Sequence, residues 1–346
     1  MTSPPSSLAD LKAALGAVRV LVVGDAMLDE YLFGAVSRIS PEAPVPVVDV
    51  KGRRYVAGGA GNVAANVASL GAAVTLLGVY GVDRNADLLD RVLAEAAVHR
   101  CEMIRCTTHP TISKTRVIAG QQQIVRFDCE DRTPYPESVI ATLLEKFDAL
   151  ISSADVCVFS DYGKGVLTDR FCQSAISRAN EEGKQTIVDP KGADYAKYRG
   201  CLLITPNQRE AGEAVGLAID TEDQLAKAGE RLLQRLPGSS VLVTRGPDGM
   251  TLFQPGRPPI TVATVAQQVF DVVGAGDTAV AALAVAMGGR LPMESAMRLG
   301  NFAAGIAVGK HGTVAVRWEE LLAHPEARVL LNTIQHPPGK VIAGSL

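Results

Sequence analysis

Short runs of branched apolar residues alternate along the chain with longer segments in which apolar residues recur at helical spacing. The runs consist mainly of Val, Ile and Leu, which predicts strands covered on both faces, and they lie at 19–24, 74–81, 156–162, 185–190, 202–207 and 241–246. The helical patterns lie between them, at 85–97, 137–152, 169–182 and 222–236. This alternation predicts an α/β fold with a mostly parallel sheet and helices on both sides.

Two segments depart from the alternation, at 45–56 and 111–128. Both are strand-like, and neither has a long helix of its own. Gly120, in the middle of the second segment, predicts a hairpin there. Small antiparallel pieces inserted in an α/β chain often form a flap, so we expect these segments to build a lid over the functional site.

The composition limits the partners and the compartment. The formal net charge is −3, from 34 basic and 37 acidic residues, which argues against nucleic acid or an anionic membrane as a partner. The six cysteines form no C-x-x-C pair, and the five histidines show no zinc-ligand spacing. The first residues lack the features of a secretory signal, and the longest apolar run, Ala279–Met287, is far shorter than the roughly 20 residues of a membrane span. We therefore expect a cytoplasmic protein with reduced thiols.

The strongest chemical signal is the sequence DVVGAGDTAVAALAVAMG, at 271–288. Gly274, Ala275 and Gly276 precede an apolar helix, and backbone amides at a helix start attract an incoming phosphate. Asp277 follows in the first turn. Its carboxylate either caps the helix or accepts a hydroxyl proton while the amides stabilise a transferring phosphoryl group. The Gly-rich turn leading into this helix favours the second interpretation.

A second Gly-rich segment, GGAGNVAANVASLG, occupies 58–71. Gly59-x-Gly61-x-x-Ala64 imitates a dinucleotide-binding fingerprint, which would indicate a nicotinamide-dependent oxidoreductase. That fingerprint should follow a buried first strand, whereas the preceding KGRRYVA is polar. The other interpretation is a turn that lets a polar ligand approach, with Asn62 either binding that ligand or capping the helix.

A third segment, TPNQREAGEAVG at 205–216, follows a buried strand and opens a helix. Asn207 and Glu210 have the spacing of a capping box, and this structural role competes with a place near Mg²⁺ and phosphate. Magnesium prefers oxygen ligands and keeps several waters, so it needs few protein groups. No G-x-x-x-x-G-K-[ST] sequence occurs, so a nucleotide would not be bound by a P-loop.

These motifs, in this order, resemble the ribokinase-like, or PfkB, sugar kinases. The resemblance implies a doubly wound α/β domain with a small β-sheet lid, ATP and Mg²⁺ as cofactors, and Asp277 as catalytic base. It covers about 18–325, with lid segments near 45–57 and 111–128, and leaves 1–17 as an N-terminal extension and 326–346 as a C-terminal tail. The family's N-x-x-E element matches Asn207 and Glu210, with Glu210 near the metal through water. Its nucleotide loop is matched in part by Thr244, Gly246 and Gly249, and Asn301 is a weaker match on the adenine side.

A narrower resemblance rests on RISPEAPVPVV (38–48), TISKTRVIAGQQQIVRFD (111–128), DYGKG (161–165) and VDPKG (188–192). These segments look like those of bacterial heptose 7-phosphate kinases of lipopolysaccharide inner-core synthesis. Such enzymes phosphorylate the anomeric hydroxyl of D-glycero-β-D-manno-heptose 7-phosphate. Many relatives carry a fused nucleotidyltransferase domain with an H-x-G-H motif. That motif is absent here, so the resemblance points to the stand-alone kinase form.

The resemblance also implies residues on the sugar side of the site. Asp29, rather than its neighbour Asp25, maps to the aspartate that holds sugar hydroxyls, and Asp161 maps to a second acidic contact. Gly58, Gly59 and Asn62 map to the sugar loop. A phosphorylated sugar needs cationic partners, for which the candidates are Lys114, Arg116, Arg126 and Lys164.

Several alternatives stay open at this point. The nearest alternative is a kinase of the same family that acts on another sugar, such as ribose, fructose or a fructose phosphate. A non-catalytic sugar-binding or regulatory relative is a further alternative, against which the intact Asp277 motif argues. Uncovered lid strands predict a homodimer formed through the lids. The sequence leaves a requirement for a monovalent cation open.

Overall fold

A computed structural model of the chain describes residues 7–265, 272–310 and 315–324. Its main sheet has the strand order β13-β12-β11-β10-β9-β8-β1-β4-β5. Neighbouring strands pair in parallel from β5 to β11, and β12 and β13 are added antiparallel at one edge. The bounds are β1 Arg19–Gly24, β4 Ala73–Tyr80, β5 Arg100–Arg105, β8 Val156–Ser160, β9 Gln185–Asp189, β10 Leu203–Ile204, β11 Ser240–Thr244, β12 Met250–Phe253 and β13 Ile260–Val262.

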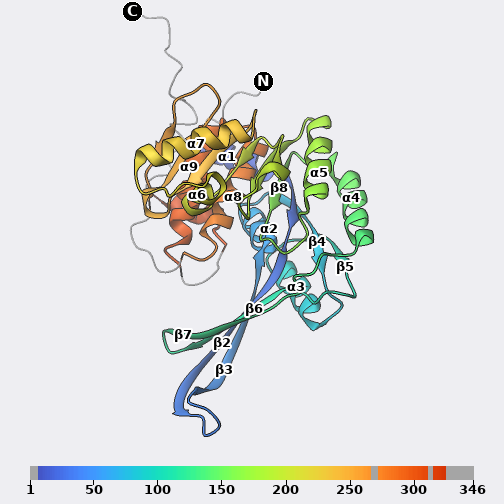
Figure 1. Ribbon diagram of the computed structural model, residues 1–346, viewed down its shortest axis with the longest axis vertical. Coiled ribbons are helices and arrows are strands. Elements are labelled where there is room, and N and C mark those ends of the chain that lie inside the picture. Colours follow the sequence, from blue (N-terminus) through green and yellow to red (C-terminus); the bar gives the residue numbers. More distant parts are fainter. Residues whose placement is uncertain (1–6, 266–271, 311–314, 325–346) are drawn as a thin grey trace, which may run out of the picture.

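Helices cover both faces of this sheet, as Figure 1 shows. In β1, Val20 and Val22 belong to the apolar core of one face, and Leu21 and Val23 to that of the other. The first core is completed by α1 Leu8–Gly16, α2 Ala60–Ser69, α3 Arg84–Glu95, α8 Ala275–Gly288, α9 Met293–Ala307 and α10 Trp318–Ala323. The second is completed by α4 Glu137–Ile151, α5 Asp169–Glu181, α6 Gln208–Val215 and α7 Glu222–Arg235. Apolar burial on both faces explains why the strands read as continuous apolar runs.

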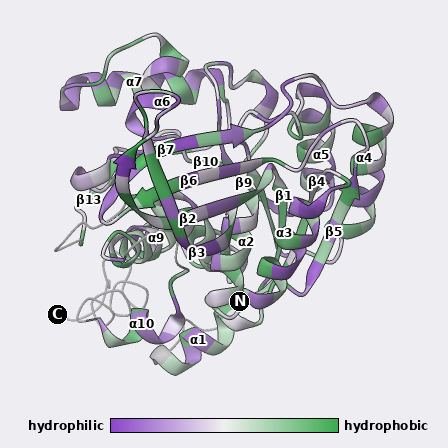
Figure 2. Ribbon diagram, turned by 90° about the horizontal axis from the view of Figure 1, so that it is seen from below, coloured by the Kyte–Doolittle hydropathy of each residue, from purple (hydrophilic) through white to green (hydrophobic). Residues whose placement is uncertain are grey.

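A second, four-stranded sheet projects from the body and forms the lid (Figure 1). Its order is β3-β2-β6-β7, with bounds β2 Ala26–Ile39, β3 Pro46–Gly59, β6 Ser113–Ala119 and β7 Gln122–Cys129. Only β2 and β6 pair in parallel among these strands. Figure 2, seen from below, shows the four strands side by side in front of the body.

The expected doubly wound α/β fold and its small β-sheet lid are confirmed. The sequence patterns missed β2, because its residues change from buried to exposed halfway along the strand and so keep no single period. Helix α1 lies inside the segment assigned to an extension, and its Leu11 and Leu15 are fully buried in the core. The expected C-terminal tail, 326–346, lies outside the described residues.

The strand order locates the functional site. Strands β8 and β4 flank β1, so the chain winds away from β1 in both directions. Ligands of open α/β sheets bind beyond the carboxyl ends of the strands at such a switch point. In the described part of the chain, no helix has both the length and the apolar character needed to cross a bilayer.

Candidate active site

A cavity of about 720 Å³ lies beyond the carboxyl ends of β9 to β11, beside the start of α8. The cavity is lined by the Gly274–Asp277 turn, together with Tyr162 and Asp189. It is also lined by all six residues that the sequence assigned to a nucleotide: Asn207, Glu210, Thr244, Gly246, Gly249 and Asn301. Residues from six separate chain segments therefore meet at one cavity, which is large enough for a nucleotide.

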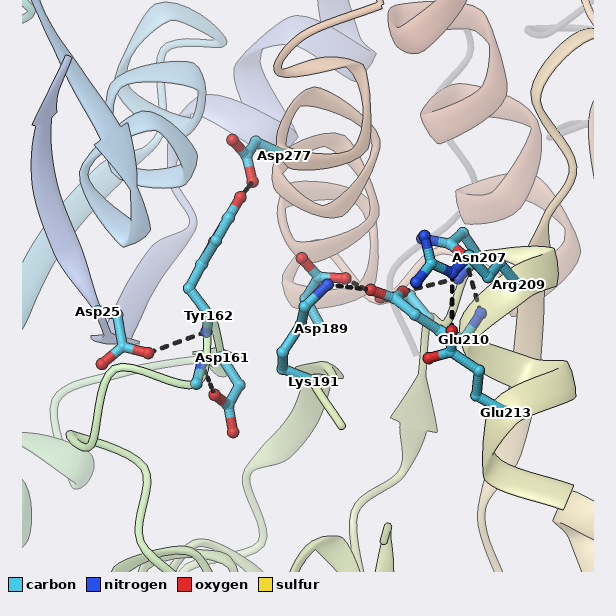
Figure 3. A network of polar contacts seen from close by, with 12 residues as sticks. Asp25, Asp161, Tyr162, Asp189, Lys191, Asn207, Arg209, Glu210, Glu213 and Asp277 are labelled. Atoms are coloured by element: carbon cyan, nitrogen blue, oxygen red, sulfur yellow. Dashed lines mark hydrogen bonds and ion pairs between the residues drawn. The ribbon is translucent and has the colours of Figure 1, made fainter. Parts of the chain in front are cut away.

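Asp277 does not cap its helix, because Gly274 holds the N-cap position in the left-handed conformation, with φ 82°. The Asp277 carboxylate is buried and faces across the site. Its Oδ2 accepts a hydrogen bond from Asn62 Nδ2 at 2.6 Å, and its Oδ1 accepts one from the Tyr162 hydroxyl at 2.5 Å. The capping alternative for Asp277 is therefore wrong. Figure 3 shows Tyr162 reaching to this carboxylate.

Burial raises the pKa of Asp277 to about 6. The hydrogen bonds from Tyr162 and Asn62 act against this rise, because they stabilise the carboxylate. Nearby Asp29 raises the pKa further, and Lys114 lowers it. A carboxylate with a pKa near 6 is mostly ionised at neutral pH and is a stronger proton acceptor than an exposed aspartate.

Asp25, at the end of β1, organises the loop that carries Tyr162. It is fully buried, and its carboxylate accepts hydrogen bonds from the backbone amides of Tyr162, Lys164 and Val166 at 2.9, 3.0 and 3.2 Å. Burial raises the pKa of Asp25 to about 6, with Asp161 adding to the rise. Asp25 and Asp29 therefore have different partners: Asp25 binds backbone amides of this loop, and Asp29 binds Arg116. From the sequence, only the family resemblance distinguished the two aspartates.

Asp161, expected to contact the sugar, is held by protein groups. Its carboxylate accepts hydrogen bonds from Lys197 Nζ, the Tyr198 hydroxyl and the Gly163 amide, each at 2.6 Å. In Figure 3 this carboxylate points away from Asp277. Asp161 lines the cavity, but its polar atoms are engaged in holding the loop.

The four basic candidates all lie at or near the foot of the lid, and three of them pair with carboxylates. Arg116 contacts Asp29 at 2.6 Å, Arg126 contacts Asp128 at 2.9 Å, and Lys164 contacts Glu130 at 2.5 Å. Lys114 lies over the Tyr162 ring, with Nζ 5.6 Å from the ring centroid. Burial lowers the pKa of Lys114, and both Asp29 and Lys164 are close enough to affect it. The lid thus contributes a mixed cluster of charges next to the base.

The glycines of the sugar loop serve close packing of the chain. A Cβ on Gly58 would lie 2.5 Å from Asp29 Oδ2, and one on Gly59 would lie 2.2 Å from the Asp25 carbonyl oxygen. Gly59 also adopts φ 56° as the N-cap of α2. This segment follows the lid strand β3 rather than the buried β1, so the context of a dinucleotide-binding fingerprint is absent. Asn62 is in α2, one turn past the cap, so its capping alternative is wrong.

Elsewhere in the cavity lining, Asn207 and Glu210 do form the capping box of α6. Glu210 Oε1 also forms an ion pair with Lys191 Nζ at 2.7 Å, and both residues line the cavity (Figure 3). Gly249, with φ 80°, leaves no room for a side chain, because a Cβ there would lie 2.0 Å from the Val262 carbonyl oxygen. Asn301 is held by a hydrogen bond from its Nδ2 to the Ala263 carbonyl oxygen at 2.7 Å.

Sequence reasoning missed Asn66, which lies outside the cavity lining and is hydrogen-bonded to Asn62. It also missed three residues that line the cavity: Tyr162, Asp189 and Lys191. Burial, with Asp277 and Glu210 adding to it, raises the pKa of Asp189 well above its usual value. Asp189 and Lys191 lie in VDPKG and Tyr162 lies in DYGKG, and both segments follow buried strands. Polar residues directly after buried parallel strands were the signal that could have found them.

This arrangement defines a class of protein: an enzyme of the ribokinase-like α/β fold, with a buried aspartate at a helix start beside a nucleotide-sized cavity and a β-sheet lid. The chain belongs to the pfkB family of carbohydrate kinases, whose model matches residues 18–320. It is therefore a sugar kinase.

Similar proteins agree with this assignment. The chain is 44% identical to the bifunctional protein HldE of Caulobacter vibrioides, over 97% of this chain and 68% of that protein. It is also 44% identical to HldE of Desulfatibacillum aliphaticivorans, over 88% of this chain and 62% of the relative. The chain thus spans about two thirds of the length of these relatives.

Solved structures share the fold at low identity. The Arabidopsis thaliana ribokinase complexed with ribose and ATP matches with a TM-score of 0.70 and 22% identity, over 91% of this chain and 99% of that one. Escherichia coli phosphofructokinase-2 in complex with fructose-6-phosphate matches with a TM-score of 0.72 and 20% identity, over 92% and 99%.

Proposed function

We propose that this kinase transfers the γ-phosphoryl group of ATP to the anomeric hydroxyl of D-glycero-β-D-manno-heptose 7-phosphate, which gives the 1,7-bisphosphate. The observation that carries the transfer chemistry is the position of Asp277. Its carboxylate is buried, does not cap α8, and lies beside the backbone amides at the start of that helix. A base and an anion-binding turn side by side are what phosphoryl transfer to a hydroxyl requires.

In the proposed reaction Asp277 accepts the proton of the anomeric hydroxyl. The hydroxyl oxygen forms a bond to the γ-phosphorus while the bond from that phosphorus to the bridging oxygen breaks, which releases ADP. The amides of the Gly274–Asp277 turn and the positive end of the α8 dipole stabilise the charge on the transferring group. Apart from its own helix turn, a Cβ built on Gly276 would meet no atom of the described residues within 4 Å, so this position leaves room for the phosphate.

ATP would lie in the cavity, with its phosphates toward the Gly274–Asp277 turn. Glu210 lines the cavity and offers carboxylate oxygens, which are ligands that Mg²⁺ prefers. Within the described residues no cluster of three metal-ligating side chains occurs. These residues fit an Mg²⁺ ion held mainly by water and phosphate oxygens. When bound, Mg²⁺ would neutralise charge on the phosphates. Lys191, now paired with Glu210, offers a further cation at the cavity wall.

The sugar phosphate would bind under the lid. Asp29 would hold sugar hydroxyls, and Lys114, Arg116, Arg126 and Lys164 would surround its phosphate. Two observations support this substrate. Lys114 is close enough to act on Asp277, and Lys164 and Arg126 are close enough to act on Lys114. The curated relatives carry the name HldE. Lid closure would exclude water, which otherwise competes for the phosphoryl group.

We also propose that two copies associate through their lids. The edge strands β3 and β7 are uncovered, and an uncovered edge favours pairing with another chain. Large apolar side chains are exposed on the same sheet, among them Phe33, Ile39, Val125 and Phe127. An exposed apolar patch of this kind is typical of a protein–protein contact.

The test replaces the proposed base, Asp277, and varies the sugar that receives the phosphoryl group. Asp277→Asn should lower turnover with ATP and heptose 7-phosphate by about 10²- to 10⁴-fold, the usual effect of losing a general base. Asp148→Asn, an exposed aspartate on α4, is the matched control and should keep wild-type turnover. Near-normal turnover in Asp277→Asn would contradict the proposal, and so would faster phosphorylation of ribose, fructose or fructose 6-phosphate by the wild type.

A further inference from the structure

Helix α2 carries two buried asparagines one turn apart, Asn62 and Asn66. They are 3% and 1% exposed. Asn66 Nδ2 donates to Asn62 Oδ1 at 3.1 Å and to the Asn62 carbonyl oxygen at 3.0 Å. Asn62 Nδ2 in turn donates to Asp277 Oδ2 at 2.6 Å. The two amides therefore form a chain that ends on the proposed base.

The orientation of this chain is fixed at its far end. Asn66 Oδ1 accepts hydrogen bonds from the Val316 backbone amide at 3.3 Å and from the Thr278 hydroxyl at 3.0 Å. A backbone N–H can only donate, so the atom that faces Val316 must be the amide oxygen. The NH₂ of Asn66 then faces Asn62, and the NH₂ of Asn62 faces Asp277. Each amide has one donor end and one acceptor end, so reversing either one breaks the chain.

We propose that Asn66 is a positioning residue for the reaction: it holds the Asn62 amide with its donor toward Asp277. This inference rests on the proposed role of Asp277 as base. A reversed Asn62 would place its Oδ1 against the Asp277 carboxylate, where two acceptors repel. Asn66 touches neither the cavity nor the base and acts only through Asn62. A purely structural role would instead be to join α2 to α8 through Thr278.

Other groups also act on Asp277, and in the described part of the chain none of them is hydrogen-bonded to Asn66. They are Tyr162, which donates to Oδ1, the carboxylates Asp29 and Asp189, and the cation Lys114. The Asn62 hydrogen bond lowers the pKa of Asp277 against the effect of burial. Losing the correct orientation of Asn62 should therefore raise this pKa.

A double-mutant cycle tests the proposal with ATP and heptose 7-phosphate. Asn66→Ala should lower kcat about tenfold, the order expected for a hydrogen bond to a charged group, and leave both KM values within about twofold. In an Asn62→Ala background the same substitution should change kcat less than about twofold, because Asn66 acts through Asn62. Val67→Ala, a fully buried α2 neighbour outside the chain, should lower Tm and keep wild-type kcat. Equal effects of Asn66→Ala in both backgrounds would overturn the proposal.

A second measurement needs no substrate. In the free protein, the Asn62 side-chain NH₂ resonances should shift with pH as Asp277 titrates, with a midpoint near pH 6. In Asn66→Ala the midpoint should rise by about one pH unit. An unchanged midpoint would overturn the role of Asn66. Undiminished turnover in Asp277→Asn would instead refute Asp277 as base and the proposed function with it, so the two failures are distinguishable.

Discussion

Replacing Tyr162 by Phe removes one hydrogen bond from Asp277 and leaves the ring in place. The hydroxyl donates to Asp277 Oδ1 at 2.5 Å in a buried environment. Burial, and then the Asp277 charge, raises the pKa of Tyr162 well above its usual value, so the proton stays on the tyrosine. The bond therefore stabilises the carboxylate form of Asp277 and keeps its pKa from rising further.

The size of the effect follows from the type of bond. A hydrogen bond to a charged group contributes about 1.5–3 kcal/mol, and one pKa unit corresponds to about 1.36 kcal/mol. Tyr162→Phe should thus raise the pKa of Asp277 by about one to two units, from about 6 to about 7–8. The base is active when ionised, so activity is lost as pH falls through this pKa. At pH 7 the ionised fraction should drop from about 90% to about 10–50%, and activity above pH 9 should be retained.

The assay is kcat/KM for ADP release between pH 5 and 9.5, for wild type and variant. Tyr195→Phe is the matched control: Tyr195 is buried, and its hydroxyl has no hydrogen-bond partner within the described part of the chain. Its profile should coincide with that of the wild type. An acid limb that stays near pH 6 in Tyr162→Phe would refute the reasoning about the Tyr162 hydrogen bond.

Three further predictions concern the lid and the phosphate turn. Arg116→Ala or Arg126→Ala should raise KM for the phosphorylated sugar much more than for its dephosphorylated form, because we propose that these guanidinium groups bind the sugar phosphate. Equal losses on both sugars would indicate a structural role. Light scattering at micromolar concentration should give the mass of a homodimer, and a monomer mass would count against lid pairing. Gly276→Val should abolish transfer while calorimetric sugar affinity stays within about threefold, because its side chain enters open space where the γ-phosphate is expected. A folded Gly276→Val enzyme with wild-type turnover would require another phosphate site.

Much of the fold could be predicted because β1, β4 and β8 are buried on both faces along their length. The lid strand β2 could not, since it begins under the body and ends exposed, and no single hydrophobic period describes it. Strand β3 and the β6–β7 hairpin were recognised from their alternation and from Gly120.

The candidate site was predictable where its residues are contiguous. The turn that carries Asp277 is one unbroken motif, but the partners of Asp277 are not near it in sequence. Asn62 and Tyr162 lie 215 and 115 positions away, and only the folded chain brings them to the carboxylate. The lid ion pairs were hidden for a similar reason. Arg116 meets Asp29 because β6 pairs with β2 in a register that sequence patterns do not reveal.

Product identification by phosphorus NMR tests the central claim most directly. The chain is incubated with ATP, Mg²⁺ and D-glycero-β-D-manno-heptose 7-phosphate. The account predicts one new phosphate ester on the anomeric carbon, an unchanged 7-phosphate signal and an equal amount of ADP. Formation of inorganic phosphate without a new ester, or an ester on another hydroxyl, would contradict it.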